Sequence, residues 1–149
     1  MGRPAVEPIG LQLTRTAKVL SRAFDEALAE VGGSLPAWLV LVSLKAGGHG
    51  TQRELADAVG IEPATLTHHL HRMEADGLVR RTRQPENRRV QVVELTADGE
   101  AAFVRLLGAV TAFDRRLRAG LSGRDVASLG DLLGRLRANA TDAHQEASS

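Results

Sequence analysis

The amino-acid sequence predicts a mainly α-helical fold with one small β-hairpin. Apolar residues recur at the three-and-four spacing of amphipathic helices through most of the chain, whereas one pair of short segments past the middle has the β-branched pattern of strands. Glycine and proline residues separate these segments. The length of 149 residues fits a single domain that can bury a core of its own.

The composition is that of a globular protein and excludes several kinds of chemistry. Apolar residues make up 43% of the chain, and 19 basic side chains balance 18 acidic ones, so the net charge alone indicates no partner. The sequence has no cysteine, which excludes disulfides, thiolate nucleophiles and cysteine-bound zinc. Its most apolar stretch, residues 35–44, is shorter than the roughly 18 residues of a membrane span, and the first ten residues lack an export signal. We therefore expect a cytoplasmic protein with no membrane partner.

The first two predicted helices differ in how they should be buried. In residues 9–31 the apolar side chains form one stripe, which indicates a helix with a single buried face, and a glycine pair ends it. Ser34 is placed to cap the next helix. Residues 37–42 are apolar on nearly every face, so this second helix must be buried all round. The glycine-rich stretch 47–50 then predicts a break in the chain.

Two shorter helices come next. Thr51 and Glu54 have the spacing of a capping box, which predicts a short helix over residues 51–58. Pro63 opens a further helix, and Gly77 lies where the left-handed cap at its end would fall. The inward-facing stripe of that helix is Leu66, Leu70 and Met73.

The rest of the chain predicts a hairpin and two long helices. Residues 78–83 and 90–95 are predicted as strands joined by a polar loop. Thr96 and Ser122 are placed to cap the two amphipathic helices that follow. From about Ala143 the tail is polar and has no apolar stripe, so we expect it to be frayed.

The order of the central elements predicts a winged helix-turn-helix, in which the helix after the turn enters a DNA major groove. Outside its inward stripe, the helix opened by Pro63 carries small or hydrogen-bonding side chains, which suit base edges and phosphates. Residues 78–93 hold five arginines and one acid on a chain whose net charge is only +1, which is typical of a phosphate-binding surface. A solvated hairpin that merely carries charge is the alternative. The predicted DNA-contacting residues are Ala64, Thr65, Thr67, His68, His71, Arg72, Arg83, Arg88 and Arg89.

Three of the five histidines, His68, His69 and His71, lie in this helix. Two of them are three residues apart on one face, and imidazole is a common zinc ligand, but no third ligand is evident nearby. DNA contact or plain solvation is therefore favoured over a metal site, with pH-dependent DNA affinity as the consequence. The chain has no glycine-rich phosphate loop, no H-E-x-x-H and no paired acids in an apolar setting, so we predict no enzyme, no catalytic residue, no metal and no cofactor.

Several short motifs occur in a fixed order along the chain. They are E-L-A-D-A-V-G-I at 54–61, T-L-T at 65–67, R-M-E-A-D-G-L-V at 72–79, P-E-N-R-R at 85–89 and L-T-A-D-G at 95–99. Together they resemble the multiple-antibiotic-resistance regulator (MarR) family of bacterial transcription factors. The resemblance implies one domain over residues 1–149, with a DNA-binding lobe over 35–95 and dimerisation helices over 9–33 and 96–142. It also implies a homodimer that binds a pseudo-palindromic operator and leaves it on binding a small molecule.

Three positions depart from the family pattern. The wing is the predicted hairpin of residues 78–95. Gln84 and Asn87 stand where the wing of the family usually has acids, so Arg88 and Arg89 should be more mobile and the wing more positive. One of these arginines is expected at the minor groove or its phosphates and the other in a structural role, and the sequence leaves open which is which. Glu62 stands where a better capping residue is usual, so the start of the recognition helix should be less firmly set.

The flanking helices indicate a dimer without reference to any family. The predicted lobe can bury its own core, but the stripes of the helices on either side need a partner, and a twofold mate would set two recognition helices about 34 to 36 Å apart. Folding back onto the chain's own lobe is the alternative. We predict a small-molecule pocket between the DNA-binding lobe and the dimerisation helices, lined by Phe24, Trp38 and His49. A plain core position is the more usual place for Trp38.

The sequence thus predicts a dimeric, sequence-specific DNA-binding regulator, a repressor that answers to a small, aromatic or anionic effector. The alternative is a winged-helix protein that binds DNA without sequence preference or docks on other proteins. Threonine and histidine side chains on the groove face favour the sequence-specific reader.

Overall fold

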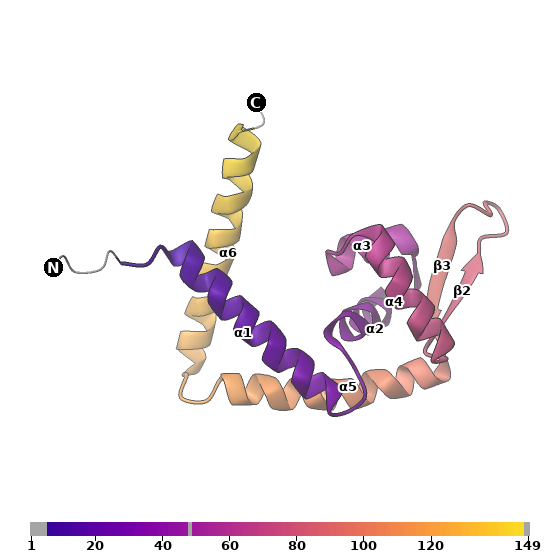
Figure 1. The fold of residues 1–149 in the computed structure, drawn as a ribbon, viewed down its shortest axis with the longest axis horizontal. Helices are drawn as coiled ribbons and strands as arrows, with labels where there is room; N and C mark the ends of the chain where they lie inside the picture. The colour runs from indigo at the N-terminus through magenta and orange to yellow at the C-terminus, as the bar shows by residue number, and fades with distance from the viewer. Residues whose placement is uncertain (1–5, 48, 148–149) are drawn as a thin grey trace. The chain divides into compact units, whose positions relative to one another are not determined.

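The computed structural model describes residues 6–47 and 49–147, apart from the side chains of residues 49 and 143–147. The chain divides into two compact units, residues 1–111 and 112–149, with the boundary inside one long helix. The first unit contains α1 (Ile9–Ala29), α2 (Leu35–Gly47), β1 (His49–Thr51), α3 (Gln52–Val59), α4 (Pro63–Ala75), β2 (Val79–Arg83), β3 (Gln91–Leu95) and most of α5 (Ala97–Leu117) (Figure 1). The second unit contains the end of α5 and α6 (Gly123–Ala147). The predicted class, mainly helical with a small antiparallel sheet, is confirmed.

The sheet has three antiparallel strands in the order β1-β3-β2. The predicted hairpin is confirmed, with Val79 opposite Leu95 at its base and Arg83 opposite Gln91 near its tip. The predicted break at residues 47–50 is confirmed, because α2 ends at Gly47, but the sequence did not predict that His49 pairs with Glu94 and opens a third strand. This strand has only three residues and includes a glycine, so neither alternation nor β-propensity could reveal it.

The predicted caps set the boundaries of the helices. The Thr51 side chain accepts the Glu54 N–H at 3.1 Å in a complete capping box at the start of α3. The backbone at Gly77 has φ +75°, the left-handed cap expected after α4. Thr96 joins that cap to the next helix, since its hydroxyl donates to the Gly77 carbonyl at 2.5 Å and accepts the Gly99 N–H at 3.0 Å.

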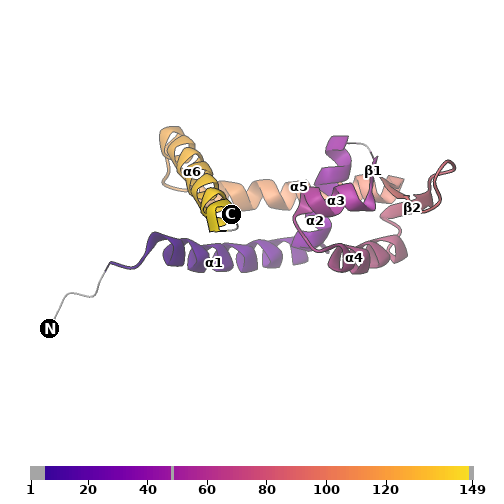
Figure 2. The ribbon, with the colours of Figure 1, turned by 90° about the horizontal axis from the view of Figure 1, so that it is seen from above.

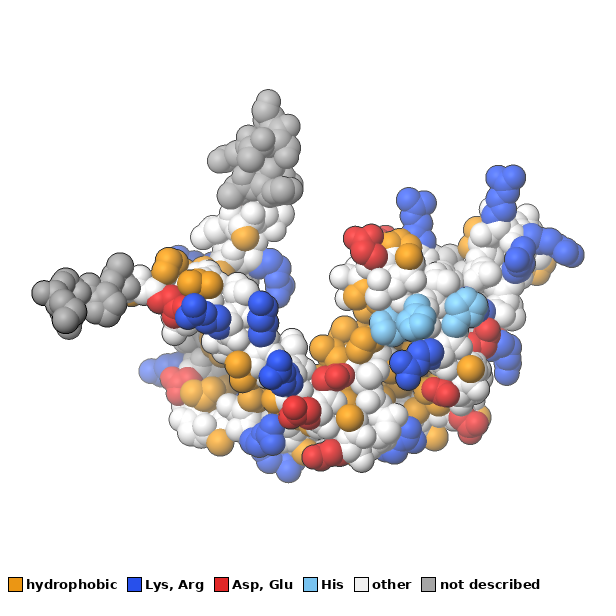
Figure 3. All heavy atoms as spheres, viewed as in Figure 1, with side chains coloured by type: hydrophobic (Ala, Val, Ile, Leu, Met, Phe, Trp, Pro, Cys, Tyr) orange, Lys and Arg blue, Asp and Glu red, His pale blue; other side chains and the backbone are white. Residues whose placement is uncertain are grey.

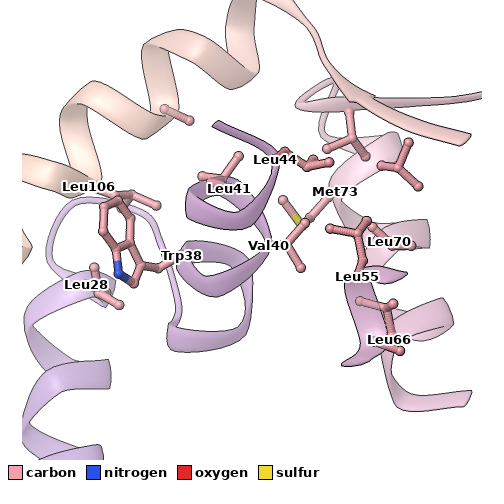
Figure 4. Packing of buried hydrophobic residues seen from close by; sticks show 14 residues of the cluster. Leu28, Trp38, Val40, Leu41, Leu44, Leu55, Leu66, Leu70, Met73 and Leu106 are labelled. Atoms are coloured by element: carbon pink, nitrogen blue, oxygen red, sulfur yellow. The ribbon is translucent and has the colours of Figure 1, made fainter. Parts of the chain in front are cut away.

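The core of the first unit packs around most of α2, but the expectation of burial on every face was wrong at Val42, which is exposed. Val40 and Leu41 have no exposed surface. Figure 4 shows Trp38 of α2 beside Leu28 and Leu106 on one side of the helix, and the leucines of α3 and α4 on the other. The inward stripe of α4 is confirmed, because Leu66, Leu70 and Met73 are all buried in this core.

Helix α1 extends away from the rest of the first unit and is buried only near its C-terminal end, at Leu28 (Figures 1 and 2). It ends at Ala29, two residues before the predicted boundary. Phe24 is half-buried against the core, and five large apolar side chains nearer the start of the helix are exposed: Ile9, Leu11, Leu13, Val19 and Leu20.

The second unit is a helical segment with its own apolar surface. Ser122 caps α6 as predicted, accepting the Asp125 N–H at 3.1 Å. The expectation of a frayed tail from residue 143 was wrong for most of that stretch, because α6 continues to Ala147. Four leucines of this unit are exposed: Leu117, Leu121, Leu129 and Leu132. Within the described residues, no helix combines the length and apolar character that a membrane span needs.

Candidate nucleic-acid interface

The outward face of α4 carries most of the residues predicted to meet DNA. Ala64, Thr65, His68, His71 and Arg72 are exposed, whereas Thr67 and His69 are half-buried. Figure 3 shows histidine side chains gathered at the surface, with arginines beside them and on the hairpin. The helix therefore presents a polar face on one side and contributes to the core with the other.

The start of α4 has no side-chain cap. Glu62 is the N-cap residue, and its side chain bonds none of the helix N–H groups in the described structure, as the sequence predicted. Pro63 has no N–H, and the geometry of an α-helix leaves the N–H groups of Ala64 and Thr65 without a partner in the helix. Such an end is favourable for a phosphate oxygen.

Thr67 connects α4 to α3. Its hydroxyl donates to the Pro63 carbonyl at 2.9 Å and accepts from the Gln52 side-chain amide at 2.5 Å. The hydroxyl proton is thus used within the protein and is not available to a phosphate. A contact between Thr67 and a thymine base would use its methyl group.

Arg81 ties the base of the wing to α4. Its guanidinium donates to both carboxylate oxygens of Glu74, at 3.0 and 3.3 Å, and its backbone N–H donates to the same group at 3.3 Å. The hydrogen bond from Arg81 lowers the pKa of Glu74. The charge of Arg81, one of the five arginines of residues 78–93, is therefore paired. The same guanidinium contacts His71, with 2.8 Å between its terminal nitrogen and Nδ1 of the ring.

The tip of the wing is shaped by its own backbone. The Gln84 N–H donates to the Val90 carbonyl at 3.0 Å, and the Asn87 side-chain oxygen accepts the Arg89 N–H at 3.1 Å. Asn87 thus makes the turn bond that an aspartate would make, without adding a negative charge. Arg80, Arg83, Arg88 and Arg89 are exposed on this hairpin.

A cavity of about 310 Å³ opens between the α1–α2 connection, α4 and α5. Its charged lining residues are Asp25, Arg72, Asp76 and Arg105, together with His69. Burial lowers the pKa of His69, and the nearby His68 and Arg72 lower it further. Arg105 is anchored, because its Nε donates to the Val31 carbonyl at 2.9 Å.

The residues predicted to line an effector pocket are not brought together in this cavity. Trp38 is buried and stacked on Phe103, with ring centres 5.5 Å apart, so it is a core residue. Phe24 is half-buried against the same core and does not line the cavity. The side chain of His49 lies outside the described residues. The lining residues come from helices distant in sequence, so no local pattern could have found them.

The histidines of α4 do not assemble a metal site in the described structure. The rings of His68 and His69 meet edge to face with centroids 5.9 Å apart. Nδ1 of His71 faces Arg81 instead. Among the residues described, no three histidine, aspartate or glutamate side chains form a group that could hold an ion.

Comparison with known proteins agrees with this arrangement. The MarR family model matches residues 34–90. The uncharacterized HTH-type transcriptional regulator YwoH of Bacillus subtilis is 29% identical over 114 residues, covering 76% of this chain and 82% of YwoH. The crystal structure of a mutant MarR from E. coli complexed with operator DNA has a TM-score of 0.80 at 25% identity, covering 87% of this chain and 94% of that chain.

A further structural relative shares the fold and carries a small molecule. The organohalide-sensing transcriptional regulator RdhR, in its 2,4-dichlorophenol bound form, has a TM-score of 0.79 at 21% identity, covering 88% of this chain and 78% of that chain.

The fold, the exposed recognition helix and these matches define a winged-helix DNA-binding protein. Residues 34–90 match the MarR family model, and the chain is similar over most of its length to HTH-type transcriptional regulators, in agreement with the resemblance found in the sequence. Members of this family are regulators and not enzymes, in agreement with the prediction from the sequence motifs.

Proposed function

We propose that the chain represses transcription as a homodimer that binds a specific operator, with α4 in the major groove and the wing against neighbouring phosphates. The observation that carries this proposal is the exposed polar face of α4 beside a hairpin with four exposed arginines. A helix of this kind fits the major groove, and arginine-rich hairpins are attracted to the phosphate backbone. The MarR relative with operator DNA supports the same mode of binding.

The predicted contacts divide into two kinds. Ala64 and Thr65 offer backbone N–H groups at an uncapped helix start, and Arg83, Arg88 and Arg89 offer positive charge, so these residues hold phosphates. His68, His71 and Arg72 present exposed hydrogen-bonding groups on α4 and are proposed to reach base edges or nearby phosphates. Thr67 acts through its methyl group and through its bond to Gln52.

The homodimer is supported by apolar surface in both units. The exposed apolar side chains of α1, and separately the exposed leucines of the second unit, have the character of surfaces that a second copy covers. We expect light scattering to give twice the chain mass. Leu129→Glu together with Leu132→Glu should shift the protein to the monomer mass, with Arg137→Glu as the control on the same helix. Monomeric wild-type protein at micromolar concentration would contradict the proposal.

The effector is proposed to be a small anion held in the cavity beside α4. Arg72 and Arg105 favour negative charge there, His69 offers a neutral hydrogen-bonding ring, and Asp25 and Asp76 limit how much charge is accepted. A volume of about 310 Å³ fits a molecule of one ring. RdhR binds a molecule of that size, 2,4-dichlorophenol. Benzoate and 2,4-dichlorophenol serve as probes, and either should raise the melting temperature of wild type more than that of Arg105→Gln.

Competition between genomic DNA fragments tests the central proposal. A sequence-specific regulator should select fragments that it binds at least about a thousandfold more tightly than bulk DNA, with affinity that falls steeply as salt rises. Equal competition by all fragments would favour the alternative, an architectural winged helix. Affinity that does not change with salt would contradict phosphate binding by the wing.

A further inference from the structure

The contact between Arg81 and His71 restricts the chemical state of that histidine. A guanidinium can only donate hydrogen bonds, and its terminal nitrogen lies 2.8 Å from Nδ1 of His71. Nδ1 must therefore accept. This excludes the doubly protonated ring and also the neutral form whose proton is on Nδ1, so the remaining proton is on Nε2.

Glu74 holds Arg81 in the position that this contact requires. Its two carboxylate oxygens accept hydrogen bonds from the Arg81 guanidinium at 3.0 and 3.3 Å, and one of them also accepts the Arg81 backbone N–H at 3.3 Å. The Arg81 side chain is only 12% exposed, so it has little freedom to leave. Glu74 and His71 are three residues apart and thus on one face of α4, where a single guanidinium can meet both.

We propose that Arg81 is a positioning residue that fixes His71 as the Nε2–H tautomer, so that α4 presents a defined N–H donor to DNA. His71 is exposed, and the acceptor is a phosphate oxygen or an acceptor on a base edge. The proposal rests on the proposed function for its DNA partner, but the tautomer itself is a property of the free protein. It also gives one arginine of the wing a role other than phosphate binding.

The tautomer is tested first, by long-range proton–nitrogen NMR on the free protein in mildly alkaline buffer. We expect His71 to show a protonated Nε2 and an unprotonated Nδ1. Arg81→Met should move both nitrogen shifts toward the exchange-averaged values of a histidine in a short peptide. Arg80→Met removes the same charge from the opposite face of β2 and should leave the His71 shifts in place. Unchanged shifts in Arg81→Met would overturn the proposal, whether or not the protein binds DNA.

The consequence for DNA is tested with a labelled duplex that carries a genomic fragment selected by the wild-type protein. We expect His71→Ala to weaken binding about tenfold, the order lost with one hydrogen bond to a charged or buried acceptor. His71→Gln, whose amide can place an N–H near the position of Nε2, should recover most of the loss. Arg81→Met should cost about as much as His71→Ala, and should cost little more when His71→Ala is already present. Independent, additive losses would contradict the proposal.

Arg81→Lys covers the case in which Arg81→Met fails to fold. Lysine keeps the charge, but its N–H groups are all on one nitrogen and cannot serve Glu74 and Nδ1 in the forked geometry of a guanidinium. In Arg81→Lys the nitrogen shifts of His71 should move toward the averaged values and the affinity for DNA should fall, although the charge is unchanged. Wild-type shifts and affinity in this variant would overturn the proposal.

Competition by unrelated duplexes distinguishes the two acceptors proposed for His71. A uniform loss of affinity in His71→Ala indicates a phosphate, and an altered preference among sequences indicates a base.

Discussion

The two ends of α4 differ in how firmly the rest of the lobe holds them. At its C-terminal end Glu74 accepts three hydrogen bonds from Arg81, and Gly77 is joined through Thr96 to the start of α5. At its N-terminal end Glu62 provides no side-chain cap, and the next N–H groups are open. The end that is fixed sets the direction of the helix, and in the proposed complex the open end keeps its donors for the phosphate backbone. The proposal therefore assigns stability and DNA binding to opposite ends of one helix.

The largest effect is expected from a substitution at Gly99 of α5, which lies at the junction with the fixed end of α4. A Cβ at this buried position would lie 2.0 Å from the carbonyl oxygen of Leu78, a backbone atom that cannot move aside cheaply. Gly99→Ala should lower the free energy of unfolding by about 3 kcal/mol or more, measured by urea denaturation.

Gly108→Ala is the matched control on the same helix. No atom lies within 4 Å of a Cβ there, so alanine should be neutral or stabilising by up to about 1 kcal/mol. Equal stability of the two variants would contradict the close approach of Gly99 to the Leu78 carbonyl at the junction between α4 and α5.

The next largest effect is expected from removing the exposed arginines at the tip of the wing, Arg88 and Arg89. Arg88→Ala and Arg89→Ala should each weaken DNA binding about tenfold across all sequences, and each should reduce the slope of log affinity against log salt by about one. Fluorescence anisotropy at several salt concentrations measures both quantities. Arg118→Ala, in the second unit, controls for general loss of charge. Wing variants that keep the wild-type slope would remove the hairpin from the interface.

A smaller effect is expected from firming the open end. Glu62→Ser places a hydroxyl where it can accept the N–H of Thr65, which should raise the free energy of unfolding by about 1 kcal/mol. Glu62→Ala removes the same carboxylate without adding a cap and should give no such gain. Equal stability of the two variants would show that the start of α4 is already satisfied in another way.

The smallest effect is a change in the pH dependence of stability. Arg81 lowers the pKa of Glu74 below its ordinary value of 4.5, so the folded state binds the Glu74 proton less readily than the unfolded chain. The resulting stabilisation is present above about pH 4.5 and is lost as the pH falls through the lowered value. Glu74→Gln should therefore be less stable than wild type at neutral pH, with a difference that shrinks in acid. A difference that is constant with pH would contradict the pairing.

The sequence predicted the elements that depend on local patterns and missed features that depend on distant contacts. The capping box at Thr51, the left-handed Gly77 and the inward stripe of α4 were correct, because each is set by residues within a few positions. Strand β1 was missed, because its hydrogen bonds are with β3 about forty positions away.

The same limit applies to the candidate site. The exposed face of α4 followed from helical periodicity alone. The pairing of Arg81 with Glu74 and His71, the internal bond of Thr67 to Gln52 and the cavity with Arg72 and Arg105 did not, because side chains on separate elements form them. Charge counting along the sequence therefore overstated the unpaired charge of the wing by one arginine.

Amide hydrogen exchange with and without a selected duplex tests the central claim most directly. We predict that DNA slows exchange at Ala64 and Thr65, whose N–H groups lack partners in the helix, and across the loop from Gln84 to Arg89. The amides around Glu74, already held by the wing, should change little. Slowed exchange confined to α1 or α6, with the start of α4 and the wing unaffected, would contradict the account.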